Sequence, residues 1–226
     1  MTIKLGNTSK DSKYLTRIKN AIALDSAHPR HHGVKMQAHH VISGKGMALS
    51  QMGKKLEKFG YDINLLPNLT FIPCTLQGAC YLGVQPHRGN HTALVDEDDY
   101  EDDLEPRDYH DMVAKKIKKL ELPLDKECPG DHKTKSETVK NKLDKLSKDI
   151  LALIQNNPSA APLTDIAKHF NPGNHIGCGG VDTVKLNSGL VACPSKRGHA
   201  GKQGPGQKAE GITYKGDGKY KLKTGR

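Results

Sequence analysis

The sequence predicts an α+β fold in which two short strands lie among amphipathic helices. Two runs, residues 35–43 and 69–72, are short, partly β-branched and followed by Gly44 and Pro73, as strands often are. Longer stretches around them repeat apolar residues every three or four positions, which is the period of an amphipathic helix. The 226 residues suit one medium domain with an appended piece, or two small domains.

The first half of the chain is predicted to hold both strands. A helix that ends before Gly60 separates them, because a glycine often follows the last turn of a helix, and an asparagine-rich turn leads into the second strand. In order, we expect a helix over 9–24, a loop over 28–33, a strand over 35–43, a helix over 47–59, a turn over 64–68 and a strand over 69–72.

The second half is predicted to be mainly helical up to residue 170. Its strongest helix covers 136–156, where an apolar stripe repeats at helical spacing. Around it we expect a helix that begins at Pro86, a helix over 107–121, a linker over 123–135, a short helix over 163–170 and a Gly- and Lys-rich tail. We therefore divide the chain into a first domain over 1–122 and a C-terminal extension over 123–226, with helices and small β pieces and no assigned role.

Charge is distributed unevenly along the chain. The net charge is +10 and the isoelectric point is near 9.3. Residues 96–108 hold nine Asp or Glu and one Arg, a local charge of −8, so that the rest of the chain carries +18. A body this basic attracts phosphate backbones non-specifically, although good solubility is an equally open interpretation.

Several classes of protein are disfavoured. No run approaches eighteen consecutive apolar residues, so we expect no transmembrane helix, and the first fifteen residues lack the apolar centre of a secretory signal. We therefore expect synthesis in the cytoplasm and, for a protein that leaves the cell, a route without a cleaved signal. Five cysteines, an odd number, argue against a disulfide framework.

Histidines give the strongest indication of chemistry. His39 and His40 are adjacent at the end of a predicted strand, so their side chains must point in different directions. His87 and His91 are four residues apart on a predicted helix, where they share a face and can hold one metal ion. Either pair alone is more often accidental or structural. Together they supply the ligands and the general base that a one-metal phosphodiesterase needs.

Parts of a known nuclease motif occur here in the correct order. They are Ala38-His39-His40, then Asn68 before an apolar strand and Pro73, and then His87 and His91. In this order they resemble the AHH branch of the HNH/endonuclease VII superfamily. The resemblance covers about residues 30–120 and implies a ββα-metal (HNH-like) nuclease core. That branch occurs in bacterial polymorphic toxins and secreted antibacterial effectors.

The resemblance implies a role for each motif residue. One divalent cation would be bound by His39, His87 and His91. His40 would be the general base that takes a proton from water, and Asn68 would hydrogen-bond near His40 and fix its ring. Three imidazole ligands favour Zn²⁺ or Ni²⁺ for affinity, whereas Mg²⁺ or Mn²⁺ is equally open for turnover, so the sequence does not distinguish the metal.

Two features beside the motif have open interpretations. Arg88, inside the second histidine pair, either contacts the phosphate or is a solvated helix residue. The acidic insert, residues 96–108, departs from the family, whose helix usually continues past the second ligand histidine. It is either a solvated loop or a DNA-mimicking segment that masks the basic cleft or docks a partner.

The C-terminal third carries a second pattern of metal-ligand type. His175 and Cys178 are followed after a gap by Cys193 and His199. Two ligands, a gap and two more resemble the spacing of a structural zinc site. Unpaired thiols and a disulfide between the two cysteines are the alternatives.

The sequence thus favours a metal-dependent endonuclease that hydrolyses phosphodiester bonds of nucleic acid, with DNA preferred over RNA. The resemblance implies an antibacterial toxin exported into a target cell by a specialised route such as a type VI secretion system. Its partners would be an acidic immunity protein and a secretion adaptor or chaperone. The alternatives are a non-catalytic, basic nucleic-acid-binding protein with structural zinc, and a phage or housekeeping endonuclease.

Overall fold

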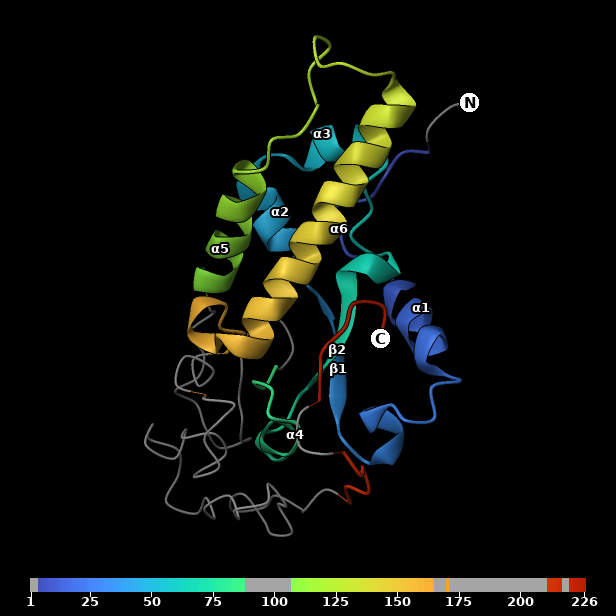
Figure 1. Ribbon diagram of the computed structural model, residues 1–226, viewed down its shortest axis with the longest axis vertical. Coiled ribbons are helices and arrows are strands. Elements are labelled where there is room, and N and C mark those ends of the chain that lie inside the picture. The colour runs from blue at the N-terminus through green and yellow to red at the C-terminus, as the bar shows by residue number, and fades with distance from the viewer. Residues whose placement is uncertain (1–3, 88–106, 165–169, 171–210, 217–219) are drawn as a thin grey trace.

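An antiparallel pair of strands runs through the middle of the computed structural model, with helices around it (Figure 1). β1 (Met36–His40) and β2 (Leu69–Pro73) pair in a register that sets His39 opposite Thr70 and His40 opposite Leu69. The structure describes residues 4–87, 107–164, 170, 211–216 and 220–226.

Helices are the main regular structure of the described residues. The α-helices are α1 (Tyr14–Ile22), α2 (Gly44–Ser50), α3 (Gly53–Lys58), α4 (Leu76–Leu82), α5 (Arg107–Lys118) and α6 (His132–Asn156). Short 3-10 turns are η1 (Pro29–His32), η2 (Leu66–Asn68) and η4 (Pro158–Ala160). The predicted α+β class is confirmed, and two strands followed by α4 are compatible with a small ββα-type core. None of the helices described here is long and apolar enough to span a membrane.

The structure differs from the predicted elements mainly in three places, and α6 also begins at His132, inside the predicted linker over 123–135. The helix predicted over 47–59 is two helices, because Gln51 adopts a left-handed conformation with φ of 60° at the end of α2. Sequence reasoning missed α4, which begins where the Thr75 side chain accepts a hydrogen bond from the Gly78 backbone N–H. The helix expected from Pro86 does not include His87, which follows α4 without regular structure. The predicted short helix over 163–170 lies largely outside the described residues.

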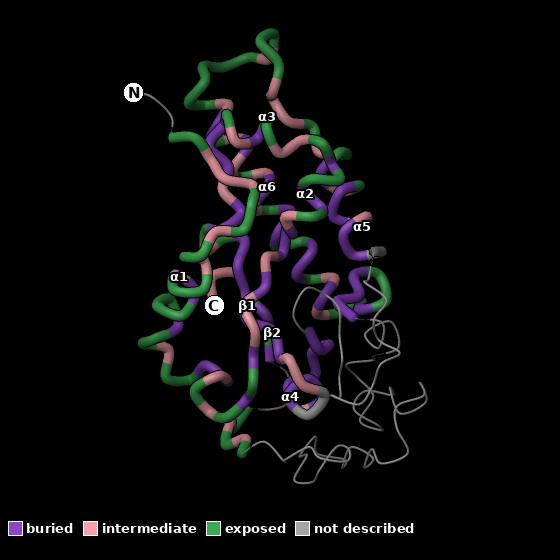
Figure 2. Tube along the Cα trace, turned by 180° about the vertical axis from the view of Figure 1, so that it is seen from behind, coloured by how far each residue is buried: buried purple, intermediate pink, exposed green. Residues whose placement is uncertain are grey.

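Both strands and the inner faces of the helices contribute to one hydrophobic core (purple in Figure 2). All five residues of β2 are buried. The apolar stripe predicted for α6 packs into the same core, through Val139, Leu143, Leu146, Ile150 and Ile154. Stability of this long helix therefore comes from burial of one face more than from its own propensity.

The last described residues return to the strands. The Phe71 N–H donates to the Arg226 carbonyl at 2.9 Å, and the Gly225 N–H donates to the Leu69 carbonyl at 2.6 Å. Figure 1 shows this segment beside β2. Residues from both sides of the predicted boundary at residue 122 thus share the core, and the division into two domains stays a prediction.

Candidate active site

A cleft with a volume of about 690 Å³ opens along β1 and its neighbours. Four histidines line it, namely His39, His40, His87 and His110. Four cationic side chains also line it, namely Lys10, Lys19, Arg30 and Lys45. No carboxylate is among the lining residues that the structure describes. The cleft is therefore positively charged around a cluster of imidazoles, a setting that suits an anionic substrate.

Two of the three predicted metal ligands meet in this cleft. β1 directs the His39 side chain inward, and the His87 backbone N–H donates to the Pro73 carbonyl at the end of β2 at 2.8 Å. The His39 Nδ1 and the His87 Nε2 lie 3.2 Å apart, and both side chains are almost fully buried. The register of the sheet thus brings together two histidines 48 positions apart in the sequence.

The distance between these nitrogens fits one metal ion. Two nitrogens bound at about 2.0–2.1 Å to one zinc ion, at a tetrahedral angle, lie about 3.4 Å apart. Burial, with a smaller contribution from Lys10, lowers the pKa of His87 to about 4, so the ring is neutral at pH 7, as a metal ligand must be. The described residues include no group of three His, Cys, Asp or Glu side chains placed to hold a metal. The third predicted ligand, His91, lies outside the described residues.

Tyr109, on α5, supports the His39 ring. Its hydroxyl donates to the Val41 carbonyl at 2.6 Å and lies 3.0 Å from the His39 Nε2. Burial raises the pKa of Tyr109 well above its usual value, so the hydroxyl keeps its proton. Sequence reasoning missed this contact because Tyr109 lies on the apolar stripe of its helix, where a tyrosine is usually a packing residue.

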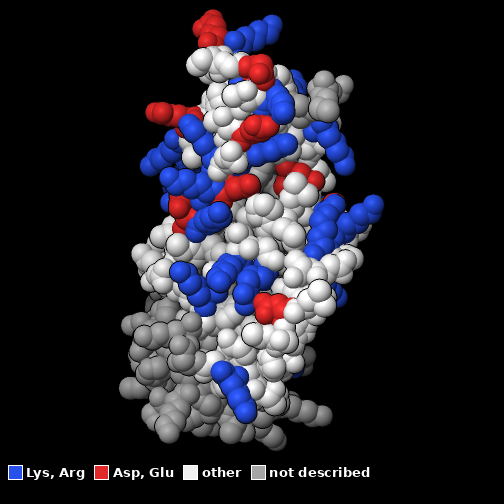
Figure 3. Space-filling view, turned by 45° about the vertical axis from the view of Figure 1, so that its right-hand side comes forward, with Lys and Arg blue, Asp and Glu red and all other residues white. Residues whose placement is uncertain are grey.

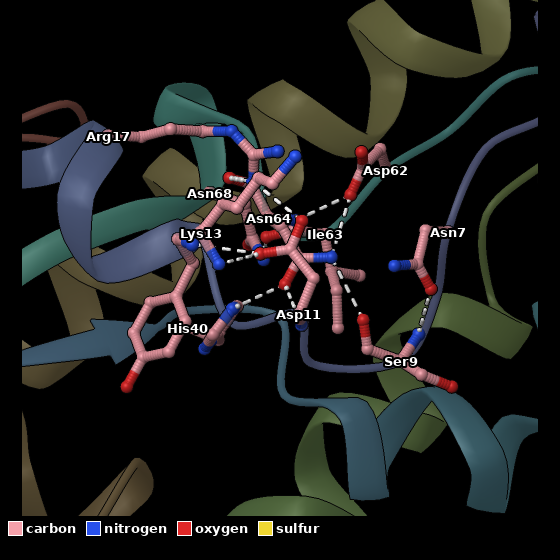
Figure 4. Close-up of polar contacts among 11 residues, drawn as sticks. Asn7, Ser9, Asp11, Lys13, Arg17, His40, Asp62, Ile63, Asn64 and Asn68 are labelled. Carbon is pink, nitrogen blue, oxygen red and sulfur yellow. Dashed lines mark hydrogen bonds and ion pairs between the residues drawn. The ribbon is translucent and has the colours of Figure 1, made fainter.

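His40 points the other way from His39, as predicted for neighbours on a strand. Its Nε2 lies 3.0 Å from the Asn64 Oδ1, and its ring packs on Tyr14 with centroids 4.5 Å apart. The backbone fixes the Asn64 amide, because Oδ1 accepts from the Asp11 N–H and Nδ2 donates to the Ser9 carbonyl (Figure 4). The His40 Nε2 must therefore donate, which leaves the lone pair on Nδ1.

The surroundings keep the His40 ring neutral. Burial is the largest cause that lowers its pKa, and the Lys10 ammonium adds to it. The hydrogen bond to Asn64 and the carboxylates of Asp11 and Asp62 oppose this shift in part. A neutral ring with one fixed N–H is ready to accept a proton at Nδ1, as a general base requires.

Asn68 does not make the predicted contact with His40. Its Oδ1 accepts from the Ile42 N–H at 2.7 Å and from the Ser147 hydroxyl at 2.9 Å. Its Nδ2 donates to the Ile42 carbonyl at 3.0 Å and to the Ile63 carbonyl at 2.9 Å. These four hydrogen bonds hold the segment after β1 against the turn before β2 and against α6. The predicted partner of His40 is therefore corrected to Asn64, four residues earlier in the same turn.

His110 is a second residue that sequence reasoning missed. It follows Tyr109 on α5, and its Nδ1 lies 2.8 Å from the Ser43 hydroxyl. The same hydroxyl caps α2 by accepting from the Gly46 N–H at 3.0 Å. This contact links α5 to α2 at the wall of the cleft. Nothing in the local sequence marks His110, and only its place beside the other histidines of the cleft makes it a candidate.

Several predicted features lie outside the described residues. They are Arg88, His91, most of the acidic insert over 96–108, and the proposed zinc ligands His175, Cys178, Cys193 and His199. Their predicted roles stay predictions.

One of three comparisons with known proteins gave a match. The search of the curated proteins gave no match for this chain. The search of the solved structures gave none either. A family model described as AHH, a nuclease family of the HNH/ENDO VII superfamily with a conserved AHH, matches residues 23–157. Nucleases of this superfamily generally use a divalent metal ion. Because the match covers more than half of the chain and includes both strands, α5 and α6, the chain belongs to the AHH nuclease family.

Proposed function

We propose that this nuclease is an endonuclease that hydrolyses phosphodiester bonds of DNA with the help of one divalent metal ion. The observation that carries the proposal is the division of contacts between the two adjacent histidines. His39 faces His87 at a distance that suits a shared metal ion, and His40 faces away from both with a fixed N–H. One strand end thus supplies a ligand and a base to the same cleft.

The chain's own residues account for the proton transfer. His40 accepts a proton from water at Nδ1, and the water oxygen then attacks phosphorus while the bond from phosphorus to the leaving oxygen breaks and that oxygen takes a proton from solvent. The Asn64 Oδ1 accepts from the opposite nitrogen and stabilises the imidazolium that forms. A positioned base of this kind typically contributes about 10²–10⁴-fold to the rate. Held by His39 and His87, a divalent ion would supply positive charge for the phosphate and the leaving oxygen.

The cationic rim of the cleft supports nucleic acid as substrate. Lys10, Lys19, Arg30 and Lys45 come from four different segments and surround the histidines. Figure 3 shows further Lys and Arg side chains on one face, mixed with Asp and Glu mainly in the upper part of the view. Phosphate backbones bind such surfaces by releasing counterions. We therefore expect cleavage to weaken steeply as the salt concentration rises.

We also propose that the protein acts as an antibacterial toxin, exported by a specialised system such as type VI secretion. The support is the AHH motif and its occurrence in such toxins. A producing cell then needs protection, and an acidic immunity protein would complement the cationic rim. A secretion adaptor or chaperone would complete the set of partners. Expression in a bacterial host should stop growth, and the same expression with His40→Ala should not.

Plasmid cleavage tests the proposed activity. Purified protein would be incubated with supercoiled plasmid and Mg²⁺, Mn²⁺ or Zn²⁺, and in parallel with single-stranded RNA. We expect nicked and linear DNA with the unchanged protein and none with His40→Ala. His132→Ala is the matched control, because His132 is an exposed histidine that packs on Phe59 and does not line the cleft. Equal cleavage by His40→Ala and the unchanged protein would refute the mechanism, and cleavage of RNA alone would change the substrate.

A further inference from the structure

Tyr109 is buried with its hydroxyl between two partners on the β1 side of the cleft. Its exposed fraction is 0%, and its ring centroid lies 5.5 Å from that of His39. The carbonyl that it binds belongs to Val41, whose own N–H donates to the Asn68 carbonyl at 2.9 Å. The backbone that receives the tyrosine proton is thus itself tied to the turn before β2.

Proton accounting then fixes the tautomer of His39. A phenol hydroxyl can donate one hydrogen bond through its proton and can accept others through its lone pairs. Because the Tyr109 proton goes to the Val41 carbonyl, the contact with the His39 Nε2 requires a proton on that nitrogen. The neutral His39 ring therefore has its lone pair on Nδ1, the nitrogen that lies 3.2 Å from the His87 Nε2.

We propose that Tyr109 is a positioning residue that holds His39 in the Nε2–H tautomer and so presents the Nδ1 lone pair toward His87. The tautomer follows from the contacts of Tyr109 with His39 and Val41 alone. Its consequence for metal affinity rests on the proposed function, in which these two nitrogens bind one metal ion. Without the hydroxyl, the His39 ring loses the contact that holds the proton on Nε2 and keeps Nδ1 directed at His87.

The size of the effect follows from similar contacts elsewhere. A partner that orients a ligand histidine typically changes metal affinity by about 10–100-fold. Tyr109 acts on the ligand and does not touch the metal position, so its loss should weaken binding without abolishing it. Loss of His39 should abolish it, and this separates a positioning residue from a ligand.

The first measurement uses the unchanged, metal-free protein. Nitrogen chemical shifts of ¹⁵N-labelled histidines report which ring nitrogen carries the proton. With His39 assigned by comparison with His39→Gln, we expect the Nε2–H form at neutral pH. A predominant Nδ1–H form would overturn the proposal. This result needs neither a bound metal nor a tyrosine variant, so it is decisive even where Tyr109→Phe does not fold.

The second measurement is calorimetric titration with Zn²⁺. We expect Tyr109→Phe to bind Zn²⁺ about 10–100-fold more weakly than the unchanged protein, with both tautomers of His39 in the metal-free spectrum. Tyr61→Phe is the matched control, because it removes another deeply buried tyrosine hydroxyl that does not line the cleft. Equal affinity and an unchanged His39 tautomer in Tyr109→Phe would overturn the proposal. Absence of Zn²⁺ binding by the unchanged protein would instead refute the metal site. The tautomer measurement would still test whether Tyr109 holds His39 in the Nε2–H form.

Discussion

Two buried histidines in this chain have similar surroundings but different contacts. His28, at the start of η1, and His87, in the cleft, are 0% and 2% exposed. Burial is the largest cause that lowers the pKa of each ring, to about 4 in both cases. At pH 7 both rings are therefore neutral. Neither burial nor the pKa tells a structural histidine from a functional one here.

The partners of the ring nitrogens make the difference. The His28 Nδ1 accepts from the Arg30 N–H at 3.2 Å, and its Nε2 lies 3.4 Å from the Tyr220 hydroxyl. Both contacts hold local structure, the first turn of η1 and the returning C-terminal segment. The His87 Nε2 instead faces an imidazole nitrogen in a cationic cleft. Nitrogens that converge on one point indicate a site, whereas nitrogens bound to backbone and packing residues indicate a fold.

The largest expected effects separate the site histidines from His28. His40→Ala should reduce cleavage by about 10²–10⁴-fold and leave metal binding intact, because it removes only the proposed base. His39→Ala should lose metal binding and cleavage together, because it removes a proposed metal ligand. His28→Ala should bind metal and cleave as the unchanged protein does wherever it is folded. Plasmid cleavage and calorimetry with Zn²⁺ on each variant measure these effects.

Other outcomes would break the comparison. Metal binding lost in His40→Ala would mean that the two adjacent histidines share one task. Cleavage lost in folded His28→Ala would mean that a buried histidine outside the cleft reaches the reaction. In either case the direction of the ring nitrogens would be a poor guide to function in this fold.

A smaller pair of effects distinguishes the role of Asn64 in cleavage from the role of Asn68 in stability. Asn68→Ala removes four buried hydrogen bonds and should lower the free energy of unfolding by at least about 2 kcal/mol. Asn64→Ala frees the His40 ring and should reduce cleavage by about 10–100-fold at saturating substrate. Urea denaturation and cleavage rates of both variants test this division. A stable, slow Asn68→Ala beside a normally active Asn64→Ala would restore the contact first predicted from the sequence.

The sequence predicted what depends on pattern and missed what depends on detailed geometry. β1, β2 and α6 were predicted, because short β-branched runs ended by Gly or Pro and helical spacing are visible along the chain. The opposite directions of His39 and His40 follow from strand geometry alone. The break at Gln51 was missed, because a left-handed glutamine has no strong local signal.

The errors in the site have a similar cause. Asn64 and Asn68 lie in one turn, and the conformation of η2 decides which of them faces His40. Tyr109 lies 70 residues from His39 on an apolar helix face, so its hydroxyl contact appears only when α5 is packed. Motif order therefore predicted that His39 and His87 lie together, while the residues that contact the His39 and His40 rings needed the fold.

The smallest expected effect is on stability in acid and concerns His28. Its pKa is lower in the folded protein than the ordinary value of 6.5, so below that value the unfolded chain binds more protons. Stability therefore falls as the pH falls from about 6.5 toward 4. Between pH 7 and pH 5.5 we expect His28 to contribute about 1 kcal/mol of this loss. His28→Asn keeps a side-chain acceptor for the Arg30 N–H and does not titrate. Its free energy of unfolding, measured by urea denaturation at the two pH values, should therefore fall by that much less. An equal loss in both proteins would mean that His28 is not held neutral by its burial, and the similarity between His28 and His87 would no longer stand.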